Sequence, residues 1–97
     1  MARPKKGRCV NCRPGSVYFK PRGVPMTELE EVSLSMDELE AVRLADHERL
    51  YHAEAAKKMD ISRQTFGRIL IVARRKISEC LIHGKALRIE YLSSGKR

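Results

Sequence analysis

The chain has no tryptophan, few aromatic residues and no long apolar run. Aromatic residues make up 5% of its 97 residues, while the apolar fraction of 42% is enough for one modest core. No apolar run approaches the roughly 20 residues of a membrane-spanning helix. The first residues, MARPKKGRC, are basic but no apolar stretch follows them, so they do not predict a secretory signal. We therefore expect a cytoplasmic protein with no membrane partner.

The cysteines do not predict a disulfide framework, because there are only three of them. Cys9 and Cys12 form one CxxC pair, whereas Cys80 lies far away in a helical pattern and is expected to be a buried apolar residue. Two thiolates supply only half of a structural zinc site, and no histidine stands at a familiar spacing from them. Zinc binding or redox sensing through Cys9 and Cys12 is therefore a secondary hypothesis, and we expect no cofactor.

Sequence motifs of common enzymes are also missing. The chain has no P-loop, no Gly-rich dinucleotide turn and no nucleophile elbow. Its three histidines are scattered, and the acidic residues of the first expected helix are interpreted as a solvated face that complements the helix dipole. We therefore expect a binding protein rather than an enzyme.

What the chain does have is basic charge, in two separate segments. Residues 1–23 contain seven Lys or Arg and no acid, residues 24–61 contain four bases and ten acids, and residues 62–97 contain nine bases and two acids. Two basic segments around an acidic middle, with a net charge of +8, indicate a polyanionic partner such as nucleic acid. The alternative is two solvated basic segments with no partner.

The residue patterns divide the chain into an arm and a helical domain. Residues 1–26 hold all four prolines and no helical period, which predicts a basic extended arm with one short strand in SVYF. Helices are expected over 35–48, 51–59 and 62–84, with a Ser35–Glu38 capping box, an N-cap at Ser62 and a stop at Gly84. Alternation in EEVSL and KALRIEY predicts short strands. The expected fold is mainly α, with a three-helix domain over 27–97 and short extended segments at both ends.

The spacing between the second and third helices is typical of a helix-turn-helix. Ala56 is small enough to let another helix cross closely, and Asp60 stands at a turn position that favours a left-handed backbone. Gly is commonest at such a position, but Asp tolerates the left-handed region better than most residues. Phe66 and Ile69 follow at the spacing of residues that hold the third helix against its neighbour.

The third helix separates into two faces at about 100° per residue. Its apolar face holds Phe66, Ile69, Leu70, Ala73, Ile77, Cys80 and Leu81. Residue types that read base edges or hold phosphates face away from the core at its front end, namely Gln64, Thr65 and Arg68, with Arg63 at the margin. Ser62 and the free amides of the helix start can hold a phosphate. Arg74 and Arg75 lie further along, where phosphate contacts are expected. Ile71 and Val72 also fall near the outward face, so either another segment covers them or they form a dimer contact.

Several stretches also resemble known families. Residues 34–77 resemble region 4 of bacterial sigma factors, in LSMDELEAVRLAD, EAAKKMDISRQTFGRIL and ARRKI. Nearly the full length is similar to an uncharacterised prokaryotic family of predicted DNA-binding proteins, domain of unknown function 134, through RPKK, YFKPRGVP, SRQTFGRIL and GKALRIE. The resemblance implies a sigma-region-4-like helix-turn-helix with recognition residues among 62–65 and 68, and a regulator by analogy only. Members often have cysteines near the N-terminus, and tend to have Gly where this chain has Arg49 and Asp60.

These observations together predict sequence-specific binding of double-stranded DNA by a transcriptional regulator whose third helix (62–83) enters the major groove. The basic arm would contact the DNA backbone or a minor groove through Arg3, Lys5, Lys6 and Arg8. The main alternative is a protein-interaction module that docks on RNA polymerase or another regulator through Ile71 and Val72. A homodimer is a further open alternative.

Overall fold

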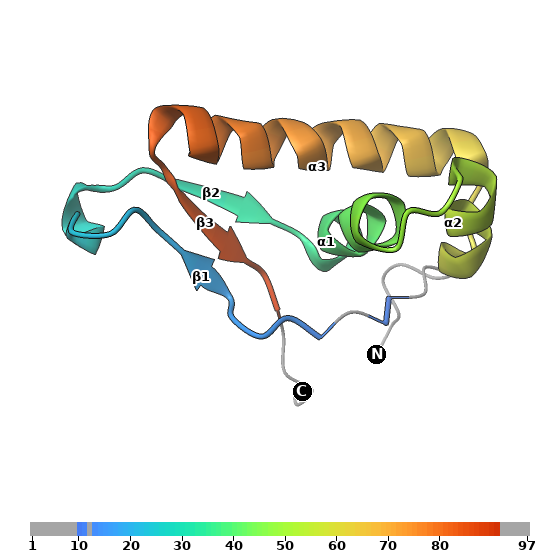
Figure 1. The fold of residues 1–97 in the computed structure, drawn as a ribbon, viewed down its shortest axis with the longest axis horizontal. Coiled ribbons are helices and arrows are strands. Elements are labelled where there is room, and N and C mark those ends of the chain that lie inside the picture. Colours follow the sequence, from blue (N-terminus) through green and yellow to red (C-terminus); the bar gives the residue numbers. More distant parts are fainter. Residues whose placement is uncertain (1–9, 12, 92–97) are drawn as a thin grey trace, which may run out of the picture.

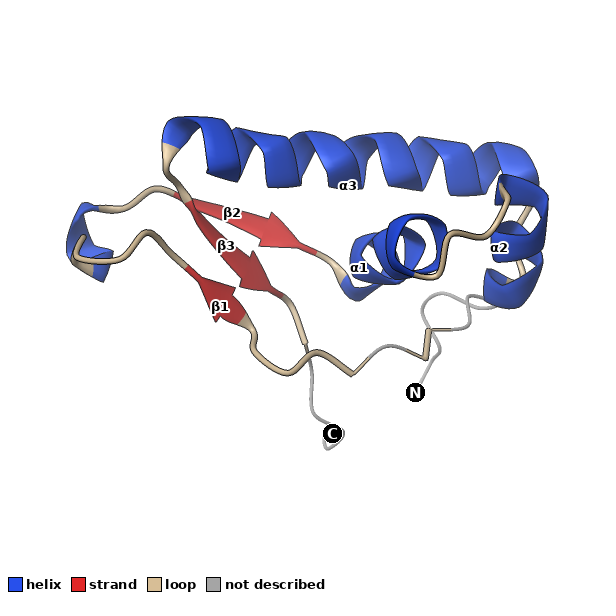
Figure 2. Cartoon of the chain, in the orientation of Figure 1, coloured by secondary structure: helices blue, strands red, loops and turns tan. Residues whose placement is uncertain are grey.

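The structure, a computed structural model, describes residues 10–11 and 13–91. Its elements are β1 (Tyr18–Phe19), the short 3-10 helix η1 (Met26–Glu28), β2 (Glu31–Leu34), α1 (Met36–Val42), the π-helical turn η2 (Arg43–His47), α2 (His52–Met59), α3 (Arg63–His83) and β3 (Ala86–Ile89). Figures 1 and 2 show the long helix α3 above the other elements, with the strands under one end and α1 and α2 under the other. The expectation of a mainly helical chain with three helices and short extended segments is confirmed.

The extended segments pair with one another in a single sheet of order β1–β3–β2. The middle strand β3 runs antiparallel to β1 and parallel to β2, with Arg88 opposite Tyr18 and Leu87 opposite Val32. The two other stretches that were expected to form short strands, SVYF and EEVSL, therefore both pair with the C-terminal strand. Because β1 belongs to the expected arm 1–26, the end of that arm joins the sheet of the following domain.

Local sequence signals explain where the helices begin and end. The predicted capping box is present: Ser35 Oγ accepts from the Glu38 N–H at 3.2 Å, and Glu38 Oε1 accepts from the Ser35 N–H at 2.9 Å. Ser62 caps α3 by accepting from the Thr65 N–H at 3.0 Å, and Gly84 ends it with a φ of 67°. The first helix differs from expectation, because α1 ends at Val42 and the chain continues as η2.

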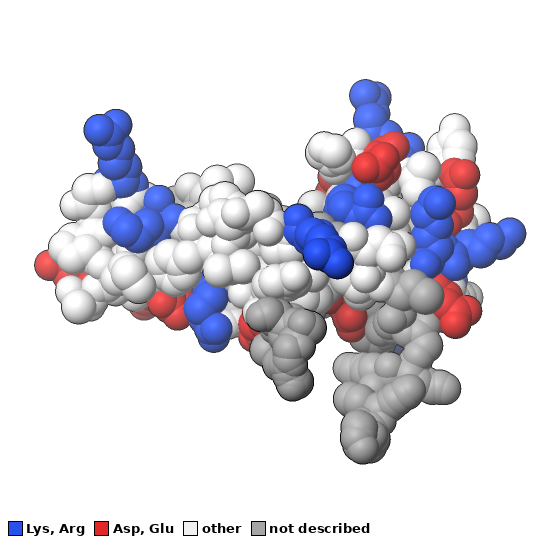
Figure 3. Space-filling model, turned by 90° about the horizontal axis from the view of Figure 1, so that it is seen from below, with Lys and Arg blue, Asp and Glu red and all other residues white. Residues whose placement is uncertain are grey.

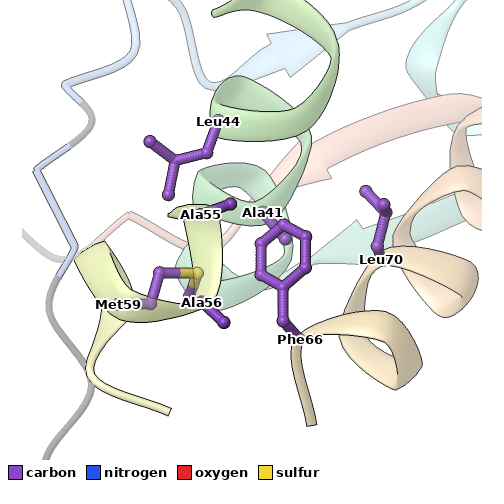
Figure 4. Packing of buried hydrophobic residues seen from close by; sticks show 7 residues of the cluster. All are labelled: Ala41, Leu44, Ala55, Ala56, Met59, Phe66 and Leu70. Carbon is purple, nitrogen blue, oxygen red and sulfur yellow. The ribbon is translucent and has the colours of Figure 1, made fainter. Parts of the chain in front are cut away.

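Two apolar clusters hold α3 to the rest of the chain. The first lies between α1, η2, α2 and the front half of α3, and Figure 4 shows its members Ala41, Leu44, Ala55, Ala56, Met59, Phe66 and Leu70. The second joins the middle of α3 to the sheet through Leu34, Ala73 and Ile89. Burial of a large apolar side chain contributes about 1.5–3 kcal/mol. Turning α3 about its axis would expose these side chains, so the two clusters fix which side of the helix faces solvent.

Two sequence-based interpretations are wrong. Leu81 falls on the predicted apolar face but is 79% exposed, because the last turn of α3 is covered only on the side of Cys80. The acids of the first helix do not all form a solvated face, because Glu40 is 1% exposed. Its carboxylate binds Arg43 Nε at 2.8 Å and accepts from the Asn11 N–H at 3.1 Å, which compensates for its burial.

Candidate nucleic-acid interface

The connection between α2 and α3 is a tight turn of three residues. Asp60 has a left-handed backbone, with φ of 59° and ψ of 45°, as its position in the sequence predicted. The Asp60 N–H donates to the Lys57 carbonyl at 3.1 Å, and the Ile61 N–H donates to the Ala56 carbonyl at 3.1 Å. This paired closure of a helix end is the Schellman arrangement. Ser62 then caps α3, so one helix ends and the next begins within Asp60, Ile61 and Ser62.

The front half of α3 is held firmly by its apolar side. Phe66 is fully buried between α1 and α2, and its ring meets the ring of His52 edge-on at 5.3 Å. The small side chains of Ala55 and Ala56 lie next to it, which lets α3 approach α2 closely. With Phe66 and Leu70 buried in this cluster, the opposite side of the same turns faces solvent.

The residues expected to read DNA lie on that outward side. Ser62, Arg63, Gln64 and Arg68 are exposed, and Thr65 is partly buried beside its bond to the Ser62 cap. Arg63, Gln64 and Arg68 make no side-chain hydrogen bond or ion pair with any other described residue. Three donor-rich side chains therefore stand together at one end of a rigid helix, with their donors unengaged by the described part of the chain.

Ion pairs separate the remaining basic residues into engaged and unengaged groups. Lys76 binds Glu38 at 2.8 Å, Lys85 binds Glu79 at 2.6 Å, and Arg88 binds Glu31 at 3.4 Å. The hydrogen bond from Lys85 also holds the pKa of the Glu79 carboxyl below its usual value. Part of the basic charge that the sequence places after residue 62 is thus neutralised by acids within the fold. Among the described basic residues of α3, three form no ion pair with another described residue: Arg63, Arg68 and Arg75.

Arg74, expected to contact phosphate, is instead bound to Asp46 of η2. Its Nη2 lies 2.6 Å from Oδ1 and its Nε lies 3.2 Å from Oδ2 of that carboxylate. These hydrogen bonds hold the pKa of the Asp46 carboxyl below its usual value and raise the pKa of Arg74. Its neighbour Arg75 is exposed and makes no such pair among the described residues. The structure therefore separates two arginines that the sequence treats alike.

Ile71 and Val72 continue the outward side of α3 after Arg68. They are 68% and 45% exposed, and with Val32 of β2 they line a shallow depression. We considered a covering segment for Ile71 and Val72, but no segment within residues 10–11 and 13–91 covers them completely. Figure 3 shows the molecule from below, where basic side chains are mixed with acidic ones and much of the surface is uncharged.

The cysteine hypothesis falls mostly outside the described residues. Cys9, Cys12 and the arm residues Arg3, Lys5, Lys6 and Arg8 all lie there. No group of three or more His, Cys, Asp or Glu in the described ranges is placed to hold a metal ion. Cys80 is buried as expected, and its burial raises the pKa of its thiol. In the same ranges, no helix combines the length and apolar character that crossing a membrane requires.

Gly67 belongs to this surface but is not among the residues expected from the sequence. Gly67 stands in α3 between Gln64 and Arg68, and a Cβ atom placed there would meet nothing within 4 Å. A glycine inside a helical pattern is itself a sequence signal, because it weakens the helix relative to alanine.

Comparison with known proteins places the chain among uncharacterised relatives. The family model described as "Protein of unknown function DUF134" matches residues 1–93. A UPF0251 protein of Prosthecochloris aestuarii is 54% identical over 88 residues, which cover 91% of this chain and 57% of the relative. Another from Pelotomaculum thermopropionicum is 56% identical and covered to 67%, and one from Vibrio vulnificus is 48% identical and covered to 96%. The chain thus spans little more than half of some relatives and nearly all of others. No solved structure matches the chain.

Proposed function

The chain belongs to the DUF134 family, and we propose that it is a cytoplasmic transcriptional regulator that binds double-stranded DNA sequence-specifically. In this proposal α2, the turn 60–62 and α3 act as a helix-turn-helix similar to that of sigma region 4, and the front end of α3 enters the major groove. The mechanism is binding rather than catalysis.

The observation that carries the proposal is the set of unengaged donors on α3. Arg63, Gln64 and Arg68 extend from one end of the helix without intramolecular partners in the described chain, although several neighbouring bases are paired with acids. An unpaired Arg can fork onto guanine and a Gln can pair with adenine in the major groove. The capped front of α3 also presents free backbone N–H groups at the positive end of its dipole, which suits a phosphate.

The remaining contacts have different roles in the proposal. Arg75 binds phosphate, and Arg74 does so by leaving or sharing Asp46. The basic arm, with Arg3, Lys5, Lys6 and Arg8, follows the DNA backbone or a minor groove.

Salt dependence of duplex binding tests the proposal. Phosphate contacts release counterions, so the logarithm of affinity should fall linearly with the logarithm of salt concentration, with a slope of about −0.9 per contact. Arg68→Ala should lower the preference for one sequence, whereas Arg75→Ala should lower affinity for all duplexes alike. A salt-independent affinity, or no binding at low salt, would contradict DNA binding. Equal behaviour of the two variants would contradict the assigned roles.

A second candidate function is docking on RNA polymerase or another regulator. It is favoured by the exposed apolar side chains along α3, which are Ile71, Val72, Leu81 and Ile82. Direct titration with purified bacterial RNA polymerase separates the candidates, because docking through these residues needs no DNA and is weakened by charged substitutions such as Ile71→Glu.

The third candidate is zinc or redox sensing through Cys9 and Cys12. It requires that the purified protein contain a bound metal ion or that its thiols be reversibly oxidised. Metal analysis of protein prepared without a chelator tests the zinc form, and finding neither zinc nor iron would contradict it.

A further inference from the structure

Ile71 is an exposed apolar residue that borders the polar side chains Gln64 and Arg68 on one side and the apolar Val72 and Val32 on the other. It follows Arg68 by three residues and Gln64 by seven, so the three side chains lie along one side of α3. Its side chain is 68% exposed, whereas the apolar side chains of Leu70 and Ala73 on the other side of the helix are buried. Exposed apolar surface beside unengaged polar donors is typical of a contact surface.

Gly67 adds an independent observation on the same side of the helix. Glycine is the poorest helix former after proline, yet it occupies an interior position of α3. No positive φ requires it, because among the glycines that the structure describes only Gly23 and Gly84 have a positive φ. No close packing in the described chain requires it either, because a Cβ there would meet no atom within 4 Å. The fold therefore gives no reason for a missing side chain between Gln64 and Arg68.

We propose that Gly67 and Ile71 form the centre of the DNA contact, where Ile71 packs on the 5-methyl group of thymine and Gly67 lets α3 approach the groove closely. This inference rests on the proposed DNA binding and specifies what it recognises. The thymine methyl is the apolar group that a base pair presents in the major groove, and apolar side chains are its usual partners. Gln64, Gly67, Arg68 and Ile71 have the i, i+3, i+4, i+7 spacing by which a homeodomain helix reads the major groove.

The charge and shape of the site agree with this occupant. Two unengaged polar side chains, Gln64 and Arg68, lie beside the gap at Gly67, and Ile71 lies one turn further on. A target that satisfies all of them has hydrogen-bonding base edges next to a thymine. A purely electrostatic contact with phosphates would not explain the exposed isoleucine, because its side chain carries no charge and donates no hydrogen bond.

Replacing thymine by deoxyuridine removes only the methyl group and tests Ile71 directly. The probe is a duplex that the protein selects from a random pool, made once with thymine and once with deoxyuridine. For the unmodified protein, deoxyuridine should weaken binding about four-fold per contacted methyl, the equivalent of one buried carbon. Ile71→Ala should bind the thymine duplex more weakly and should no longer distinguish the two duplexes. Val72→Ala is the matched control, and it should still distinguish them.

The outcomes separate this inference from DNA binding itself. If the unmodified protein selects a sequence but binds both duplexes equally, the thymine contact is wrong and the proposed function stands. If Ile71→Ala responds to deoxyuridine as the unmodified protein does, another residue contacts the methyl and the inference is again wrong. If the protein selects no duplex, both proposals fail.

Gly67→Ala tests the close approach by two readouts that move in opposite directions. Alanine should raise the thermal unfolding temperature, because it is the better helix former and meets no atom. The same variant should weaken binding to the selected duplex by at least about five-fold, because the added methyl overpacks the contact with the DNA. Ser78→Ala, at an exposed position further along α3, is the control and should leave affinity unchanged. A stabilised Gly67→Ala with undiminished affinity would overturn the close approach.

Discussion

Arg74 of α3 and Asp46 of η2 are joined at two points, with Nη2 2.6 Å from Oδ1 and Nε 3.2 Å from Oδ2. The pair ties the middle of the long helix to η2, 28 residues earlier in the chain. It also engages one of the arginines that the sequence assigns to phosphate contacts. Since a guanidinium already bound by a carboxylate has to leave or share it to bind phosphate, Asp46 should oppose DNA binding.

Removing the charge of Asp46 should therefore strengthen DNA binding. Asp46→Asn frees Arg74 and removes a negative charge near the interface, so we expect duplex affinity to rise about two- to five-fold at low salt, as for an exposed ion pair. Fluorescence titration with a labelled duplex measures the change. Arg74→Ala in the Asp46→Asn background is the control, because it should abolish most of the gain. An affinity that Asp46→Asn leaves unchanged would exclude Arg74 from the interface.

The same pair should contribute a small, pH-dependent stabilisation. The pKa of Asp46 in the folded protein lies below the ordinary value of 3.8 because Arg74 donates to its carboxylate. Its contribution is thus fully present above the unfolded pKa and is lost as the pH falls through the lower folded pKa. Because the side chains are 51% and 42% exposed, we expect less than about 1 kcal/mol. Urea unfolding should show Asp46→Asn less stable at neutral pH, with the difference shrinking as the pH falls below the ordinary pKa of the carboxyl and vanishing once Asp46 is protonated in the folded protein as well. A difference that persists in acid would contradict this origin.

Two non-glycine residues with left-handed backbones allow a matched comparison. Arg49 has a φ of 63° and Asp60 a φ of 59°, and both are exposed. Glycine removes the steric cost of this region, and arginine tolerates it less well than aspartate does. Arg49→Gly should therefore stabilise the protein by about 0.5–1 kcal/mol, and Asp60→Gly by less. Thermal unfolding of the two variants measures both gains. A larger gain from Asp60→Gly would contradict the expected order.

The buried carboxylate of Glu40 should be important for stability. It is 1% exposed and binds Arg43 Nε and Nη2 at 2.8 Å and 2.9 Å. Glu40→Ala leaves the guanidinium and the Asn11 N–H without this acceptor, so we expect a loss of about 3 kcal/mol in urea unfolding. Glu40→Gln keeps an acceptor of the same shape and should lose less. If Glu40→Gln is as stable as the unmodified protein, the charge of the ion pair contributes nothing that an amide does not. If Glu40→Ala is as stable as well, the importance of Glu40 is contradicted.

The local features of this fold could be predicted from the sequence because each depends on a few neighbouring residues. The Ser35–Glu38 capping box, the cap at Ser62, the stop at Gly84 and the left-handed Asp60 are of this kind. The three strands were also predicted from short patterns, but their order in the sheet depends on contacts distant in sequence.

The features that were missed depend on the surroundings. A helical wheel assumes equal cover along the whole helix, so it buries Leu81 although the last turn of α3 is covered on one side only. It also treats Arg74 and Arg75 as equivalent, since the partner Asp46 comes from a distant π-helical turn. The buried Glu40 likewise accepts from the N–H of Asn11, 29 residues earlier in the chain, and no local pattern indicates that contact.

Selection of bound sequences from a random pool of duplexes tests the central claim most directly. We expect the protein to enrich one short sequence, with a base pair pattern that Arg68→Ala relaxes and Arg75→Ala leaves unchanged. Two inverted copies of the sequence would further indicate a homodimer, whereas a single copy would indicate a monomer on DNA. A pool that stays unenriched after repeated rounds, at salt concentrations where the protein is folded, would contradict sequence-specific DNA binding.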